Sequence, residues 1–149
     1  MKKTFSHLDA QGHARMVNVS GKPVQYRRAV AVGVLRCARA TVKALKVDAL
    51  PKGDVLAVAR IAGIQAAKRT SELIPLCHPL PLHQVKVDFR VKADRVEIRA
   101  EAITEGKTGV EMEALTAVTV AALTLYDMMK AVDKGMVIDA VTLELKEKR

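Results

Sequence analysis

The sequence predicts an α+β fold in which one antiparallel sheet is covered by helices on one face. Four segments alternate apolar and polar side chains with the period of a strand, residues 28–36, 84–92, 95–103 and 136–146. Three others repeat their apolar side chains at helical spacing, residues 38–49, 54–73 and 110–134. The resulting order is βααββαβ, a split βαβ arrangement with an extra helix, which predicts a ferredoxin-like sheet.

The start of the chain carries few signals of regular structure. Residues 1–27 are polar and interrupted by glycine and proline, so we expect residues 1–13 to be mobile and residues 14–19 to form one short edge strand. The first full strand begins at Arg28, and the helix after it ends at Pro51 and Gly53.

The second helix has a clear beginning and an unusual middle. Asp54 is a natural N-cap for the apolar repeat that begins at Val55. Gly63 lowers helix propensity at mid-helix, which predicts that another backbone packs closely there. Beyond this helix, Pro75, Pro79 and Pro81 predict a rigid, non-helical loop.

A hairpin over residues 84–103, turning at Ala93 and Asp94, separates this loop from the longest helix. A sheet covered on one side leaves its other face bare. We expect that face to be rich in valine and alanine and to pack against another subunit.

The longest helix is predicted over residues 110–134, about six turns, after the glycine-rich turn at residues 104–109. One side is apolar, formed by Val118, Ala121, Ala122, Leu125, Met129 and Val132. The other is a polar stripe, formed by Glu113, Thr116, Thr124, Asp127 and Lys134.

Asp127 and Lys130, one turn apart, form a candidate acid/base couple, although an ordinary surface pair has the same spacing. Glu113 lies 14 residues before Asp127, hence about 21 Å away along a helix. Both carboxylates therefore cannot touch one reacting bond. Either the ligand is long, or each end of the helix serves a different pocket across a subunit interface, which we favour.

Composition limits the class of protein. The 149 residues predict a single domain over residues 1–149 with a sizeable apolar core that contains few aromatic side chains. No apolar run approaches the length of a membrane span, and the first five residues lack the apolar stretch of a secretory signal, so we expect a cytoplasmic protein. Cys37 and Cys77 have no metal-ligand spacing, which predicts reduced thiols and no metal site.

The formal net charge of +9 favours an anionic partner. Residues 106–108 read Gly-Lys-Thr, but a phosphate loop needs a glycine five positions earlier, where Glu101 stands. Lys107 remains either an anion ligand or a solvated lysine. The same choice is open for Lys52 in its turn, and for Lys68, which a helix C-terminus favours in any case.

His78, between two prolines, is either structural or a hydrogen-bonding site residue. A nucleophilic couple with Cys77 is a weak possibility, since catalytic pairs are seldom chain neighbours.

Three stretches, residues 52–70, 73–80 and 106–132, resemble the MoaC family, the cyclic pyranopterin monophosphate synthases of molybdenum cofactor biosynthesis. They include Ala-Arg-Ile-Ala-Gly-Ile-Gln-Ala-Ala-Lys-Arg-Thr, Pro-Leu-Cys-His-Pro-Leu and Tyr-Asp-Met-Met-Lys-Ala-Val, and the likeness runs from about Met16 to Lys146. The resemblance implies a lyase that converts 3′,8-cyclo-7,8-dihydroguanosine 5′-triphosphate into cyclic pyranopterin monophosphate with loss of pyrophosphate. It also implies a ferredoxin-like fold and a homohexamer, a trimer of dimers, with sites at dimer interfaces.

The resemblance also implies the site residues. By position the catalytic residues are Asp127, Lys52 and Lys130. The substrate-binding residues are Lys68, Leu76, Cys77, His78, Glu111, Met112 and Glu113. Lys146 matches another family lysine. No cofactor is implied, although Mg²⁺ could accompany the triphosphate, and neither nucleic acid nor membrane is an expected partner.

Two other classes fit parts of the sequence. An RNA-binding ferredoxin-like module would explain the basic charge, but such modules stack bases on aromatic side chains, and this chain has no Trp, two Phe and two Tyr. An oligomeric ligand sensor would keep the pocket without the chemistry.

Overall fold

The computed structural model describes residues 6–149, and its elements follow the predicted order. Its strands are β1 (Gln25–Arg36), β2 (Gln84–Val91), β3 (Arg95–Gly106) and β4 (Val137–Lys148). Its helices are α1 (Arg39–Lys46), α2 (Val55–Lys68), the single turn α3 (Thr70–Leu73) and α4 (Glu111–Met129). The expectations for the first five residues lie outside the described part of the chain.

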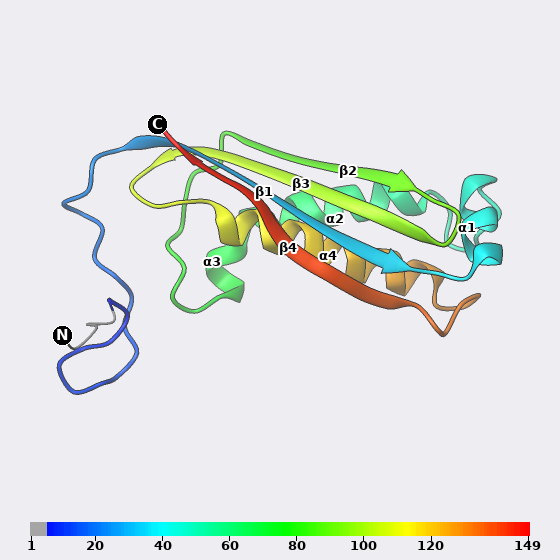
Figure 1. Cartoon of the computed structure of the whole chain (residues 1–149), viewed down its shortest axis with the longest axis horizontal. Coiled ribbons are helices and arrows are strands. Elements are labelled where there is room, and N and C mark those ends of the chain that lie inside the picture. Colours follow the sequence, from blue (N-terminus) through cyan, green and yellow to red (C-terminus); the bar gives the residue numbers. More distant parts are fainter. Residues whose placement is uncertain (1–5) are drawn as a thin grey trace.

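The four strands form one antiparallel sheet in the order β2-β3-β1-β4. Strand β1 is central and pairs with β3 along its whole length, from Gln25 opposite Gly106 to Arg36 opposite Arg95. Helices α2 and α4 lie side by side beneath one face of this sheet (Figure 1). The predicted α+β class and the βααββαβ order are confirmed.

Small side chains bring α4 close to the sheet. Ala31 of β1, Ala100 of β3 and Ala117 of α4 are all fully buried in one core cluster. At Gly33 even a methyl group would lie 2.7 Å from Val118 Cγ1. The sheet and α4 therefore pack at a separation that larger residues at these positions would not permit.

Close packing around a small residue also joins α2 to α4. A Cβ atom at Gly63 would lie 2.9 Å from the carbonyl oxygen of Ala117, so the predicted close approach of another backbone is confirmed. The predicted N-cap is also present, because Asp54 Oδ1 accepts a hydrogen bond from the Ala57 N–H at 3.0 Å.

Two expectations about element boundaries and one about burial are wrong. Helix α4 ends at Met129, not at Lys134, and Val132, predicted on its apolar side, is 50 % exposed. Residues 15–19 form no strand, and the only pairing in this part of the described chain is one bridge between Leu8 and Ala14. Glu113 and Thr116, predicted in the polar stripe, are buried, because the first half of α4 is covered on more sides than its periodicity indicates.

The bare sheet face differs from its prediction as well. The alanines of β1 and β3 point to the helices, and the bare face presents Val30, Val32 and Val34 in register with Glu101, Arg99 and Glu97. Ion pairs cross this face, including Arg28 to Glu101 at 2.6 Å and Arg99 to Glu144 at 3.1 Å. The bare face therefore consists of a short row of valines surrounded by ion-paired side chains.

The expectation that no apolar run could span a membrane is also wrong in its literal form. Helix α4 has the length and apolar composition of a span. It is, however, the core helix of this fold, packed against the sheet on one side and against α2 on another, and this placement accounts for its composition.

Replacing Gly63 by alanine tests the contact between α2 and α4. At an ordinary helical position this change stabilises a protein by about 1 kcal/mol. Here the added methyl group meets the Ala117 carbonyl oxygen, so we expect the free energy of unfolding to fall by about 1–3 kcal/mol. Urea denaturation of Gly63→Ala, beside the exposed control Gln65→Ala, measures it. A Gly63→Ala protein as stable as the wild type would contradict the close packing.

Candidate functional site

The C-terminal end of α4 carries a carboxylate held between two lysines. Asp127 Oδ1 accepts from Lys130 Nζ at 2.7 Å, and Asp127 Oδ2 accepts from Lys52 Nζ at 3.1 Å. Lys52 also donates to the Asp127 carbonyl oxygen at 3.2 Å. All three side chains are about half exposed. The pair Asp127–Lys130 has the spacing of a surface pair, but Lys52 comes from a loop 75 residues away, so the cluster is a tertiary arrangement.

The two lysines fix the charge of Asp127. The hydrogen bond from Lys130, and then that from Lys52, lower the pKa of the Asp127 carboxyl group. In return, Asp127 raises the pKa of Lys130. Near neutral pH, Asp127 is therefore ionised and Lys130 is charged, so each is in the state from which it can exchange a proton. The ion pair also makes Asp127 a weaker base and Lys130 a weaker acid than either would be alone.

Local structure places each member of this cluster. Lys52 lies in the turn between α1 and α2, where Gly53 has a φ of 80° and Asp54 caps α2. Lys130 is the C-cap residue of α4.

Beyond the helix, Asp133 ties this end to α1. Its Oδ2 accepts from the Ala38 N–H at 2.8 Å and from the Thr41 hydroxyl at 2.9 Å. The hydrogen bond from Ala38 is also the main cause of the lowered pKa of Asp133. Asp133 was not predicted as a functional residue, because no local pattern in the sequence indicates a bond over 95 residues.

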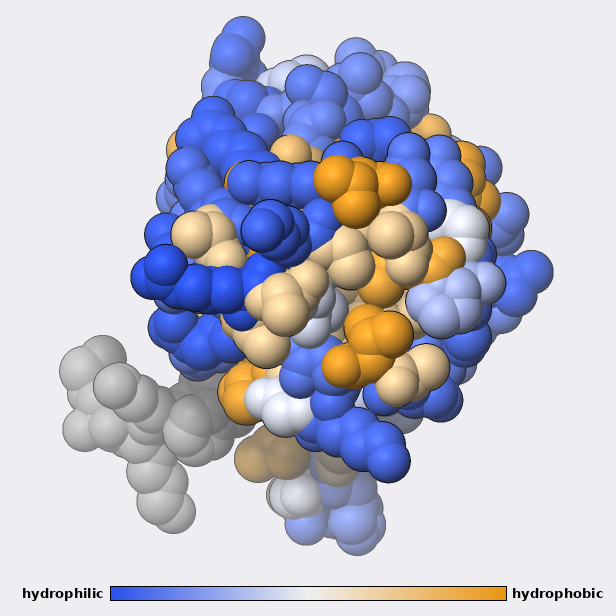
Figure 2. Space-filling view, turned by 90° about the vertical axis from the view of Figure 1, so that its right-hand side faces the viewer, coloured by the Kyte–Doolittle hydropathy of each residue, from blue (hydrophilic) through white to orange (hydrophobic). Residues whose placement is uncertain are grey.

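Apolar side chains gather on this end of the molecule. Figure 2 shows them at the centre of a face that is otherwise hydrophilic. Val47 after α1, Val132 after α4 and Val137 at the start of β4 are large apolar residues in this part of the chain, and each is at least half exposed. A contiguous patch of this kind is typical of a surface that another protein covers.

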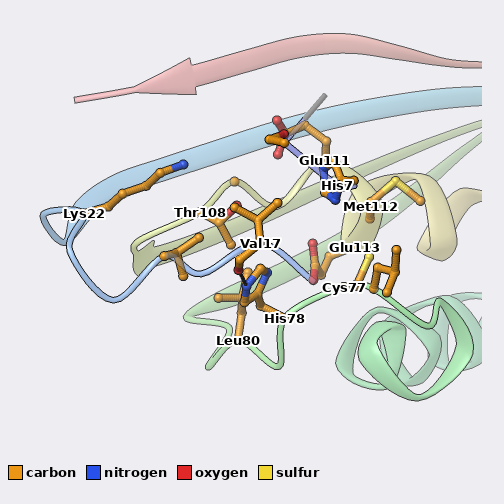
Figure 3. Close-up of a pocket in the computed structure, with 14 residues that line it drawn as sticks. His7, Val17, Lys22, Cys77, His78, Leu80, Thr108, Glu111, Met112 and Glu113 are labelled. Atoms are coloured by element: carbon orange, nitrogen blue, oxygen red, sulfur yellow. Dashed lines mark hydrogen bonds between the residues drawn. The ribbon is translucent and has the colours of Figure 1, made fainter. Parts of the chain in front are cut away.

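A pocket of about 370 Å³ lies at the other end of α4. The loop after α3 and the first turn of α4 form its floor, and residues from the segment 6–22 form a wall (Figure 3). Six of the predicted substrate-binding residues line it: Leu76, Cys77, His78, Glu111, Met112 and Glu113. The structure thus brings together residues from two separate stretches of the sequence.

Glu113 is the most unusual group in this pocket. Only 4 % of its surface is exposed, and burial raises the pKa of its carboxyl group to about 7. Its own backbone N–H opposes this shift, and the charge of Glu111 adds to it. Glu111 in turn forms an ion pair with Lys146 of β4. Glu113 is therefore poised to gain or lose a proton near neutral pH.

His78 and Cys77 do not form a nucleophilic couple. His78 Nε2 donates to the Val17 carbonyl oxygen at 2.6 Å (Figure 3). Burial, and then the nearby Glu113 carboxyl group, raise the pKa of the Cys77 thiol, which keeps it protonated. Cys77 therefore contributes to the wall of the pocket without the thiolate that a nucleophile requires.

The predicted residues thus fall into two groups. Glu113 and Asp127 lie about 21 Å apart along α4, so the pocket and the lysine cluster are separate in one chain. Lys68, at the end of α2, is exposed and lines neither. Lys107 is neither free nor part of the pocket wall, because it donates to the Ser20 carbonyl oxygen at 2.5 Å.

Some residues around the pocket were not predicted. His7, Val17, Val19, Lys22 and Thr108 also line it. Four of these come from the segment before β1, which has no periodic pattern that could have indicated a wall. Within residues 6–149 no three His, Cys, Asp or Glu side chains are grouped as metal ligands.

Comparison with known proteins gives the family. The model of the MoaC family matches residues 16–149. The chain belongs to the MoaC family.

Its relatives cover nearly all of this MoaC chain. A protein of Novosphingobium aromaticivorans, named cyclic pyranopterin monophosphate synthase, is 58 % identical over 139 residues, which are 93 % of this chain and 88 % of that protein. Proteins of the same name from Thermomicrobium roseum and Parvibaculum lavamentivorans are 58 % and 56 % identical, over 93 % and 97 % of this chain. The matches cover 85 % and 91 % of those two proteins. The predicted family is thus confirmed.

The raised pKa of Glu113 makes stability depend on pH. The carboxyl group ionises near pH 4.5 in the unfolded chain but near pH 7 in the folded protein. Its contribution to stability is therefore complete below pH 4.5, falls as the pH rises to about 7, and is constant above that. We expect Glu113→Gln to match the wild type near pH 4.5 and to be more stable by on the order of 2 kcal/mol at pH 8.

Urea denaturation at the two pH values measures this difference. The exposed control Glu72→Gln should differ from the wild type equally at both. A Glu113→Gln difference that did not change with pH would show that Glu113 ionises normally.

Proposed function

We propose that this chain is a cyclic pyranopterin monophosphate synthase, a lyase that converts 3′,8-cyclo-7,8-dihydroguanosine 5′-triphosphate into cyclic pyranopterin monophosphate and pyrophosphate in molybdenum cofactor biosynthesis. The relatives of that name support the activity. The observation in the structure that carries it is Asp127 held between Lys52 and Lys130.

The reaction requires proton transfers at ring nitrogens and carbons as the purine ring opens and a pterin ring forms. Asp127, kept ionised by its two lysines, accepts protons, and Lys130 returns them. Glu113, with its pKa near 7, is the second group that can exchange a proton under the same conditions. Glu113 and Asp127, which lie in different environments, thus provide one carboxyl group that can be protonated near neutral pH and one that is ionised.

Expulsion of pyrophosphate develops negative charge, which cations stabilise. Lys22 lies in the wall of the pocket, and Lys146 reaches its edge through Glu111. These lysines suit the triphosphate of the substrate, for which resemblance to the family also implies Lys68. We assign no resident metal to the site, and Mg²⁺ would enter with the triphosphate.

The separation of the two groups along α4 supports a site shared between subunits. We propose that the Asp127 end of one copy meets the pocket of a second copy, within a homohexamer built as a trimer of dimers. The apolar patch next to Asp127 provides a surface for this contact (Figure 2). We place the enzyme in the cytoplasm, with neither nucleic acid nor membrane as a partner.

Neither alternative class gains support from the structure. The bare sheet face, on which an RNA-binding module would stack bases, carries ion pairs. Phe89 packs against the core beneath Arg60, and the ring of Tyr26 lies 5.2 Å from the guanidinium of Arg149. A sensor requires a pocket but no lysine-flanked carboxylate.

Pyrophosphate release under anaerobic conditions from freshly made 3′,8-cyclo-7,8-dihydroguanosine 5′-triphosphate tests the activity. We expect release by the wild type, and a fall of about 10²–10⁴-fold in Lys52→Ala and Asp127→Ala, because each change removes part of the proton-transfer cluster. The exposed lysine variant Lys43→Ala should keep wild-type activity.

Circular dichroism would establish that each variant is folded. Release unchanged in both site variants would contradict the assigned residues. A folded wild type that binds the nucleotide without releasing pyrophosphate would instead indicate a sensor.

Complementation between two inactive variants tests the shared site. Asp127→Ala and Glu113→Ala should each be inactive alone. When the two chains are co-expressed, half of the dimers formed at random contain one of each, and one of their two sites is intact. We therefore expect recovery of about a quarter of wild-type activity. No recovery from mixed oligomers, verified by differently tagged chains, would place both residues in one subunit's site.

A further inference from the structure

The segment 6–22, hereafter the strap, crosses the pocket before β1 begins. Figure 3 shows its chain passing the pocket, with Val17 above His78 and Lys22 farther along. Five of the fourteen residues that line the pocket belong to it: Ser6, His7, Val17, Val19 and Lys22. The pocket therefore has a wall that is not part of the sheet or of any helix.

Two side chains of the body hold the strap in place. His78 Nε2 donates to the Val17 carbonyl oxygen at 2.6 Å, and Lys107 Nζ donates to the Ser20 carbonyl oxygen at 2.5 Å. Within residues 6–149 these are the only hydrogen bonds that join the strap to the rest of the protein. Both acceptors are backbone carbonyls, so the strap is held through its main chain.

All other hydrogen bonds of the strap are internal. Asp9 accepts from the backbone of Gln11 and His13, Arg15 donates to the His7 carbonyl oxygen, and the Ser20 N–H donates to the side chain of Asn18. Most of its side chains are exposed, although Val17 and Val19 are half-buried against the pocket. A segment with internal bonds and few bonds to the core can leave it as a unit at small cost.

We infer that the strap is a gate of the pocket, latched by Lys107 and His78, and that it opens for a ligand to enter and closes over it. This inference rests on the proposed function for the identity of the ligand, a nucleoside triphosphate. A closed strap keeps bulk water from the pocket while pyrophosphate is lost, and so disfavours hydrolysis of the triphosphate. His78 thereby has two roles, as a pocket residue and as a latch.

A strap that opens and a fixed pocket wall predict different effects on the rates of ligand binding and release. Weakening a latch that holds both the empty and the occupied pocket closed speeds entry and exit by similar factors and leaves the affinity nearly unchanged. Losing a ligand contact instead speeds only the dissociation. Replacing Lys107 distinguishes a latch from a ligand contact, because its ammonium group is bound to the strap.

The test compares the full-length wild type, Lys107→Met and the control Lys92→Met, which removes an exposed lysine near the hairpin turn. Trypsin cleavage after Arg15, in the middle of the strap, reports opening without any ligand, because a protease needs several residues of free chain around the cut. Loss of one hydrogen bond should raise the cleavage rate about fivefold in Lys107→Met and leave it unchanged in Lys92→Met. Equal cleavage rates in all three proteins would overturn the inference.

Stopped-flow binding of a fluorescent methylanthraniloyl derivative of GTP provides the second measurement. We expect both rate constants to rise by a similar factor in Lys107→Met. A rise in the dissociation rate constant alone would identify Lys107 as a ligand contact and overturn the gate. If the wild type released no pyrophosphate, the proposed function would fail while the ligand-free cleavage result would still decide the strap.

Discussion

The close packing of α4 against both the sheet and α2 is the constraint on which the rest of the structure depends. Gly63 allows the backbones of the two helices to approach, and Gly33 with the alanines of β1 and β3 allows α4 to lie close to the sheet. Because this contact is made by small residues, α4 has little freedom to shift or rotate. Both groups of candidate site residues lie on this helix or against it, so their positions follow from the same packing.

The fixed helix gives its two carboxyl groups opposite properties. Glu113, in the first turn, is buried beside the pocket, and burial raises its pKa to about 7. Asp127, in the last turn, lies at the surface, and its lysines lower its pKa. One element of regular structure therefore holds one carboxyl group with a pKa of about 7 and another whose pKa lies below its ordinary value.

The positive charge of the protein is also distributed unevenly between the sheet and the two ends of α4. The net charge of +9 is not spread evenly, because the bare sheet face pairs its arginines with glutamates. The lysines at the ends of α4 instead bind single carboxylates or backbone carbonyls and remain partly exposed. An anionic ligand would therefore be attracted to the ends of α4 more than to the sheet.

The sequence by itself determined the elements and several local features. Periodicity predicts four strands and three of the four helices, Asp54 marks the start of α2, and Gly63 marks a close contact, because each signal depends on neighbours a few residues away. The spacing of Asp127 and Lys130 is local in the same sense. For most of the site residues, resemblance to the MoaC family was needed, because residues that meet from different elements share no local pattern.

Only the tertiary structure decided how those residues meet. It brought Lys52 to Asp127, buried Glu113 against the periodicity of its helix, ended α4 at Met129, and laid the strap over the pocket through Val17 and Ser20. Each of these depends on contacts between residues distant in the chain. Their desolvation and hydrogen bonding are set by the packed fold and leave no pattern in the sequence.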